Sequence, residues 1–529
     1  MSMTQTEHPV LDPSASKKSG WILFAVCILG IMIQIDFTAV NVALIAIGRS
    51  LHTGLSTVQW ALSAYVLAWG AFVLAAGRCA DLFGKRRTFL IGTVLFMLGS
   101  ALTGAATQAW FLIFGRVVQG IGGALFLPGL YTLVFTAFPE NRRGFALGVL
   151  TSAIAIGLAI GPTFGGIVLS ILNWRWIFFL NLPLGIPVIA IILWAVQREP
   201  WRVSAEPMDY IGAGLIALAL TIFMFGLNQA SIWGVGSAKF LITLAASLVL
   251  GLAFVLYEWR QAHPLIQLSI FRNQIFLGCV LTYVIMGFGF ASVLIVGGLY
   301  LENALNYSAF NTGFIFLIMT AMFAWLSVYG GKLVDRMDPR VPIILGGVAT
   351  TLSFLVFSLC TQHSPLWMPM LALALFGMGG GLGFPALNAT MMKSIPSNQL
   401  NIASSAFAMF GCIGNTTGLI LSATLIVTFG HRKLNQLLSH STWNLTADQT
   451  TVLHKIIGTP HYNAKQLVNF PIENVPGLLD TLRSAFIHGM AISMLIAMSL
   501  AILGILITAL LVKGFPEKSS EPHPTTVHL

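Results

Sequence analysis

Residues 77–87 read GRCADLFGKRR and residues 331–340 read GKLVDRMDPR, and each stretch directly follows a long apolar run. In both copies an aspartate stands four residues after a glycine, and basic residues come next. The two short basic segments therefore indicate an internal repeat. Parallel repeats are typical of transporters that are built from two homologous halves.

The composition places the chain in a membrane. Of its 529 residues, 57% are hydrophobic and 8% are charged, whereas soluble domains carry about 25% charged residues. A soluble enzyme and a disordered chain are therefore excluded. The net charge of +10 fits the Lys and Arg excess of cytoplasmic loops, and we expect no nucleic-acid partner. The five cysteines lack the spacing of a metal site, so no metal is expected.

Fourteen apolar runs are long enough to cross a bilayer, which takes about 20 helical residues. Most of the 27 lysines and arginines fall in alternate connections, and this bias predicts that both termini are cytoplasmic. The predicted spans are 21–47, 57–77, 88–107, 109–135, 144–169, 176–197, 210–230, 240–258, 274–301, 310–331, 341–361, 366–391, 402–429 and 484–512.

The repeat also predicts the domain organisation. Its copies follow the second and the tenth span, whereas two six-span halves would separate them by six spans. Two helices are therefore predicted to be inserted between the halves. The fold class is an all-α polytopic membrane protein, with the predicted parts 1–20 (cytoplasmic tail), 21–200 (N-terminal six-helix bundle), 201–262 (inserted helices), 263–512 (C-terminal six-helix bundle, with a long outer loop at 430–483) and 513–529 (cytoplasmic tail).

Two ionisable residues lie well inside predicted spans, Asp36 in the first and Arg116 in the fourth. A charge inside the membrane is costly unless it is paired or wetted, so both are functional candidates. With a rise of about 1.5 Å per residue, both lie in the outer or middle part of the membrane and can approach each other. We expect Asp36 to be the proton-linked carboxylate and Arg116 to tune it. The alternative is that the two residues only brace their helices.

The fifth span carries a glycine pattern, GLAIGPTFGG, at residues 157–166. Gly157, Gly161 and Gly165 share one helix face, and small residues at this spacing let two helices approach closely. Pro162 removes one helical hydrogen bond and is expected to kink the span, and Gly166 completes the pattern. The simpler interpretation is a generic helix-packing face.

These motifs, in their order along the chain, resemble the fourteen-span drug:proton antiporter family (EmrB/QacA type) of the major facilitator superfamily. The resemblance covers nearly the whole chain and implies the major facilitator fold, with two six-helix bundles plus two inserted helices. It identifies the pattern of the fifth span as the antiporter motif and the stretch around Arg116 as the proton-transfer motif. Ile45 departs from the family, which usually has proline there.

In that family the basic inner-loop motif forms a gating latch that holds the outward-facing state. The resemblance assigns this role to Gly77, Asp81, Gly84, Lys85, Arg86, Arg87, Asp335 and Arg336. The alternative is a cation cluster that only sets the topology. That alternative explains the arginines but not an aspartate at the same place in both copies.

The resemblance implies proton-coupled efflux of lipophilic drugs or related small molecules by alternating access. Candidates for a central substrate cavity, chosen by polarity or aromaticity, are Gln34, Asn41, Tyr65, Trp69, Gln119 and Tyr131. The alternatives are a dedicated exporter of an endogenous metabolite, such as a siderophore, and a major facilitator importer. No catalytic set of residues supports an enzyme.

The expected location is the bacterial cytoplasmic (inner) membrane. The proton gradient is the expected energy source, with no cofactor. The expected partners are the lipid bilayer, protons and a small lipophilic substrate. In a Gram-negative host they would include a periplasmic adaptor and an outer-membrane channel.

Overall fold

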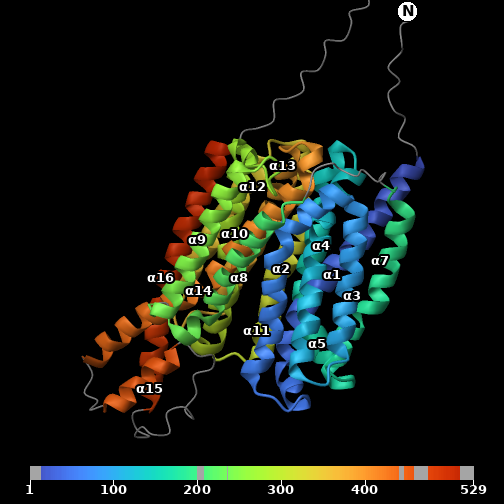
Figure 1. The fold of residues 1–529 in the computed structure, drawn as a ribbon. Helices are drawn as coiled ribbons and strands as arrows, with labels where there is room; N and C mark the ends of the chain where they lie inside the picture. Colours follow the sequence, from blue (N-terminus) through green and yellow to red (C-terminus); the bar gives the residue numbers. More distant parts are fainter. Residues whose placement is uncertain (1–12, 199–207, 235, 440–445, 458–474, 513–529) are drawn as a thin grey trace, which may run out of the picture.

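The computed structural model describes residues 13–198, 208–234, 236–439, 446–457 and 475–512 (Figure 1). Within them, fourteen helices are long and apolar enough to cross a membrane, the number expected from the sequence. The predicted tail 513–529 and most of the tail 1–20 lie outside the described residues. The major helices run Pro13–Ser50 (α1), Leu55–Phe83 (α2), Lys85–Gly104 (α3), Ala109–Ala137 (α4), Arg143–Ile171 (α5), Arg175–Phe179 (α6), Asn181–Ala195 (α7), Tyr210–Trp233 (α8), Ala238–Arg260 (α9), Gln274–Leu299 (α10), Ala309–Arg336 (α11), Arg340–Ser358 (α12), Trp367–Lys393 (α13), Leu400–Ser439 (α14), Ala447–Ile457 (α15) and Val475–Leu511 (α16).

The helices form two bundles, as the repeat predicts. In the first, α3 and α2 pack on α4, and α1 packs on α5. In the second, α11 and α12 pack on α13, and α10 packs on α14. The beginning of α1 and the end of α16 lie at one end of the molecule, which we call the termini end, and α15 lies at the opposite, loop end (Figure 1).

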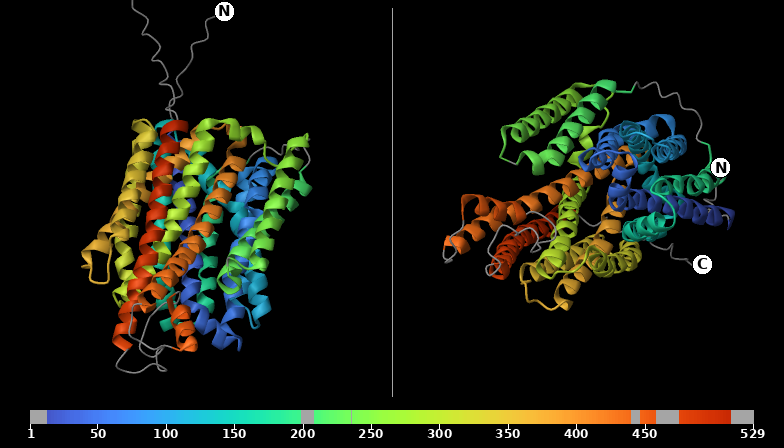
Figure 2. Two further views of the ribbon diagram at one scale, coloured as in Figure 1. Left: turned by 90° about the vertical axis from the view of Figure 1, so that its left-hand side faces the viewer. Right: turned by 90° about the horizontal axis from the view of Figure 1, so that it is seen from below.

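The inserted helices α8 and α9 form an antiparallel pair at the periphery of the molecule (Figure 2). They pack mainly on each other, and α8 contacts α2 and, less extensively, α14. Asn228 of α8 donates a hydrogen bond to Ser63 Oγ of α2 at 2.9 Å, and Met224 packs over Gly70, where a Cβ atom would lie 2.7 Å from its sulfur. The pair is thus attached chiefly to the first bundle.

The prediction of one long loop at 430–483 was wrong in its extent. Helix α14 continues to Ser439, α15 forms at Ala447–Ile457, and α16 begins at Val475. Leu434, Leu453 and Leu482 belong to one buried cluster, because each of these three helices has an apolar face. The loop end therefore carries packed helices.

The two bundles meet at the termini end, where glycines permit close contact. Gly148 of α5 lies against the backbone of Ser327 in α11, and Gly144 lies against Gly331. Gly77 of α2 lies against α14, and a Cβ atom there would come within 2.9 Å of the Asn401 carbonyl oxygen. A larger side chain at any of these positions would push the halves apart.

Candidate functional site

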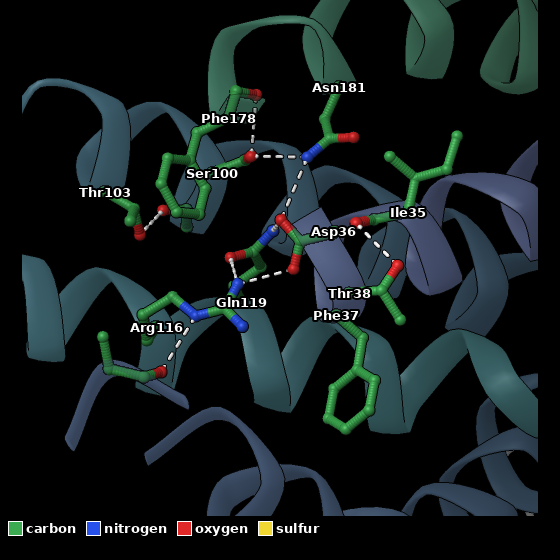
Figure 3. A network of polar contacts seen from close by, with 12 residues as sticks. Ile35, Asp36, Phe37, Thr38, Ser100, Thr103, Arg116, Gln119, Phe178 and Asn181 are labelled. Atoms are coloured by element: carbon green, nitrogen blue, oxygen red, sulfur yellow. Dashed lines mark hydrogen bonds and ion pairs between the residues drawn. The ribbon is translucent and has the colours of Figure 1, made fainter. Parts of the chain in front are cut away.

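The two ionisable residues expected inside the membrane form an ion pair (Figure 3). Arg116 Nη1 lies 2.5 Å from Asp36 Oδ2, and both side chains are 0% exposed. Asp36 comes from α1 and Arg116 from α4, so the pair joins two helices of the first bundle. A buried charge is tolerated only when it is paired and hydrogen-bonded, and each residue meets this need of the other.

Two amide side chains complete the shell around the carboxylate. Gln119 Nε2 donates to Asp36 Oδ1 at 2.9 Å, and Gln119 Oε1 accepts from Arg116 at 2.7 Å. Asn181 Nδ2, at the start of α7, lies 3.3 Å from the same Asp36 oxygen and donates to Ser100 Oγ at 2.9 Å. The groups that approach Asp36 are donors. The shell is thus complementary to an ionised carboxylate.

The guanidinium of Arg116 is held on several sides. Its Nε donates to the Ala61 carbonyl of α2 at 3.0 Å. Its Cζ lies 4.3 Å from the centre of the Tyr65 ring and 5.7 Å from that of Phe178. Its Nη2 is buried and has no hydrogen-bond partner among the described residues. One donor is therefore free to bond a new partner without breaking the pair.

A cavity of about 130 Å³ lies between the bundles. The first bundle contributes Gln34 of α1, Tyr131 of α4 and one face of α5. The second bundle contributes, among others, Tyr283, Phe290, Phe323, Phe384, Asn388 and Asn415. Because cavities for drug-sized ligands usually hold about 300–1,000 Å³, this one must widen to admit such a ligand.

The cavity contains some of the predicted substrate residues and not others. Gln34 and Tyr131 line it. The structure places Gln119 in the ion-pair shell and Tyr65 beneath Arg116 instead. Neither Asn41 nor Trp69 lines it: the amide of Asn41 donates to the Phe37 carbonyl of its own helix, and the buried Trp69 Nε1 has no partner among the described residues.

Helix α1 connects the ion pair to the cavity. Gln34 and Asp36 are two residues apart, so their side chains leave α1 about 200° apart. One faces the cavity and the other faces Arg116. Any shift of α1 that follows a change at Asp36 therefore moves a cavity wall.

The glycines of the fifth span hold α1 close to α5. A Cβ atom on Gly157 would lie 2.7 Å from the Ile31 carbonyl oxygen, and one on Gly165 would lie 3.0 Å from that of Ala39. Gly161 lies against the Thr38 hydroxyl, whereas Gly166 has open space around it. Pro162 does not interrupt the helix, because α5 continues through it.

The repeated aspartates contact the opposite bundle at the termini end. Asp335 accepts hydrogen bonds from the backbone N–H groups of Gly144 at 3.0 Å and Phe145 at 2.9 Å, at the start of α5. It also pairs with Lys393 at 3.2 Å. Asp81 accepts from Asn401 Nδ2, in the first turn of α14, at 2.7 Å. Each aspartate thus docks at a helix N-terminus, where a negative charge is stabilised.

The basic residues of the predicted latch differ from its aspartates in the contacts that they make. Lys85 donates to Thr136 Oγ1 at 2.9 Å and Arg86 to the Leu193 carbonyl at 2.7 Å, both within the first bundle. Arg336 is exposed. Gly84, with φ of 92°, forms the turn between α2 and α3, and such a positive φ favours glycine. Asp81, Asp335 and Gly77 contact the opposite bundle, whereas the hydrogen bonds given for Lys85 and Arg86 stay within the first.

Sequence reasoning missed several residues that the site uses. Asn181 and Ser100 support Asp36, and Asn401 and Lys393 receive the repeated aspartates. The available signal was a polar amide or hydroxyl inside or next to an apolar span. That signal is weak, because such groups often bond only to their own helix. Among the described residues, no group of His, Cys, Asp and Glu could hold a metal ion.

Two bundles of membrane-spanning helices around a shared cavity define a membrane transporter. The model of the Major Facilitator Superfamily matches residues 26–419, and the chain belongs to this superfamily. It is 31% identical over 399 residues to the multidrug resistance protein Stp of Mycobacterium tuberculosis (strain CDC 1551 / Oshkosh). The aligned residues cover 75% of this chain and 74% of that protein.

Other comparisons agree with this assignment. The tetracenomycin C resistance and export protein of Streptomyces glaucescens is 28% identical, over 76% of each chain. The proton:xylose symporter XylE, of the same superfamily, superposes with a TM-score of 0.60 at 13% identity, covering 94% of this chain and 97% of that one. This structural likeness concerns the fold alone.

Proposed function

We propose that the protein is a proton-coupled exporter of lipophilic small molecules that works by alternating access. The observation that carries the proposal is the fully buried Asp36–Arg116 pair, in which Asp36 lies on the helix that also presents Gln34 to the cavity between the bundles. The similarity to multidrug resistance and antibiotic export proteins supports outward transport.

The proton would bind at Asp36. Protonation removes the negative charge that Arg116 neutralises, and the guanidinium then needs another partner. It would keep the hydrogen bonds that it already donates to the Gln119 oxygen and the Ala61 carbonyl, and its unbonded Nη2 could donate to a new acceptor. Because α1 packs against α5 through Gly157, Gly161 and Gly165, a shift of α1 is passed to the interface of the bundles.

The contacts of Asp81 and Asp335 would hold the termini end closed in one state of the cycle. The excess of Lys and Arg in the connections at this end assigns it to the cytoplasmic side of the membrane. The structure then corresponds to a state that is closed toward the cytoplasm. Breaking both contacts would let the bundles separate there and admit substrate.

The test is export by everted membrane vesicles that contain Asp36→Asn protein. Asparagine keeps the size of the side chain but cannot release a proton, so we expect loss of gradient-driven export with substrate binding retained. Asp480→Asn is the matched control, since Asp480 is 63% exposed and pairs with Arg483 at the start of α16. Full gradient-driven export by Asp36→Asn would refute the proton role.

A further inference from the structure

We infer that the cavity between the bundles takes an uncharged substrate with aromatic surface and a few hydrogen-bonding groups, so that exchange against protons moves net charge. The inference rests on the proposed export function and specifies its substrate class. It follows from the chemistry of the cavity wall.

No residue that lines the cavity, among those described, is an Asp, Glu, Lys, Arg or His. Asp36 and Arg116, the ion pair of α1 and α4, are 0% exposed and neutralise each other. An ion entering this space would lose its hydration without gaining an opposite charge, which is costly in a low-dielectric site. The wall therefore disfavours both cations and anions.

The aromatic rings of the second bundle favour flat apolar groups. Phe384 is at the centre of this wall, with its ring centre 5.4 Å from that of Tyr283, 5.7 Å from Phe323 and 6.4 Å from Phe290. Aromatic faces can also attract cations. Here the rings are packed edge to face or tilted against one another, so they do not form an open cage around a single point.

The first bundle and α14 supply polar groups to the cavity wall. The side chains of Gln34, Tyr131 and Asn415 line the cavity, and the structure gives them no hydrogen bond to any described residue. Asn388, whose amide nitrogen donates to the Phe384 carbonyl at 2.9 Å, also lines the cavity. Amides and a phenol match the carbonyl and hydroxyl groups of a neutral molecule.

The charge balance of transport follows from this substrate class. If an uncharged molecule leaves while one or more protons enter, each cycle carries at least one positive charge inward. A monovalent cation exchanged for a single proton would carry none. A membrane potential therefore drives or opposes the first exchange, depending on its sign, and does not affect the second.

The experiment uses the full-length protein in proteoliposomes with an acidic interior and a pH dye inside. Triphenylphosphine oxide, which is neutral, and methyltriphenylphosphonium, a cation with the same three rings, are added outside in separate runs. We expect the phosphine oxide to trigger proton efflux, and valinomycin with potassium on both sides to accelerate it by removing the opposing potential. Asp36→Asn proteoliposomes give the background leak.

The other outcomes separate the inference from the proposed function. Proton efflux triggered mainly by the phosphonium and unaffected by valinomycin would overturn the neutral substrate class but leave proton-coupled export standing. If neither probe triggers efflux, both the inference and the exporter assignment fail for this class of compound.

A charge added to the wall provides a second test. Asn415→Asp should give export of methyltriphenylphosphonium at about tenfold higher apparent affinity, equivalent to about 1.4 kcal/mol. Asn228→Asp is the matched control, because it places the same carboxylate on α8, outside the cavity lining. Equal phosphonium recognition by both variants and the unchanged protein would contradict the inference.

Discussion

At the residue scale the protein is organised around one buried ion pair. Asp36 has its Arg116 partner at 2.5 Å, with Gln119 and Asn181 beside the other carboxylate oxygen. Such a pair contributes little net stability, because desolvation of both charges offsets their attraction. In the function proposed above, its role is to exchange a proton at Asp36 rather than to add stability.

The ion pair also leads to a testable prediction about the stability of the protein. Arg116→Met leaves the buried Asp36 without its main partner, and breaking one side of such a pair costs about 3–5 kcal/mol. The double variant Asp36→Asn, Arg116→Met removes both charges and should recover most of this loss. The measurement is the apparent melting temperature of each purified variant in detergent.

The control for this cycle is Asp480→Asn, which breaks a pair whose aspartate is 63% exposed and should change the melting temperature little. If the changes in melting temperature caused by Asp36→Asn and by Arg116→Met simply add in the double variant, the two residues do not interact as the structure shows.

At the scale of elements, the contact between α1 and α5 connects chemistry to movement. Helix α1 carries Asp36 on one side and Gln34 on another, and α5 carries both the glycine face and the N-terminus that receives Asp335. A change at the ion pair therefore reaches the cavity and the contact between bundles through two helices. The glycines make this possible because they leave no side chain between the two backbones.

The glycine face predicts a contrast between two neighbouring positions. Gly161→Ala places a methyl group against the Thr38 hydroxyl, whereas Gly166→Ala meets nothing within 4 Å. We expect Gly161→Ala to reduce export strongly by separating α1 from α5, and Gly166→Ala to leave it nearly unchanged. Vesicle export normalised to the amount of protein in the membrane measures the difference. Equal export by the two variants would mean that the close approach is not required.

At the scale of the whole molecule, two bundles contact each other and the inserted pair is attached to one of them. The bundles touch at the termini end through Asp81 with Asn401 and through Asp335 with the start of α5. The inserted helices are attached to α2 through Asn228 and Ser63. This attachment predicts that α8 and α9 move with the first bundle as a rigid unit.

Cross-links at these two places should have opposite effects. In a background without the five native cysteines, Asp81→Cys with Asn401→Cys joins the bundles, and a short thiol cross-linker should stop export until it is cleaved. Ser63→Cys with Asn228→Cys joins α8 to α2, and export should continue after cross-linking. Each pair is compared with its own uncross-linked protein, so any effect of the substitutions cancels. Loss of export in the second pair would show that the inserted helices move independently.

Much of the fold was predictable from the sequence, because the bilayer imposes a simple length and hydropathy rule on each span. The fourteen crossings and the two inserted helices followed from apolar runs and from the spacing of the repeat. The helices at the loop end did not, since a polar segment with a short amphipathic stretch does not differ visibly from a loop. Leu453 packs there only because α14 and α16 extend beyond the membrane-length core.

The site divides in the same way. The sequence by itself determined that Asp36 and Arg116 are exceptional, because charge is rare inside apolar spans. It also determined that Asp81 and Asp335 are equivalent, because they occupy the same place in a repeat. Only the tertiary structure decided that Gln119 and Asn181 belong to the ion pair, and that each repeated aspartate contacts the opposite bundle. The physical reason is that the cost of burying a charge can be inferred from the apolar residues around it in the sequence. Hydrogen-bond partners, in contrast, depend on which helices pack together and on how far along the membrane normal each side chain lies.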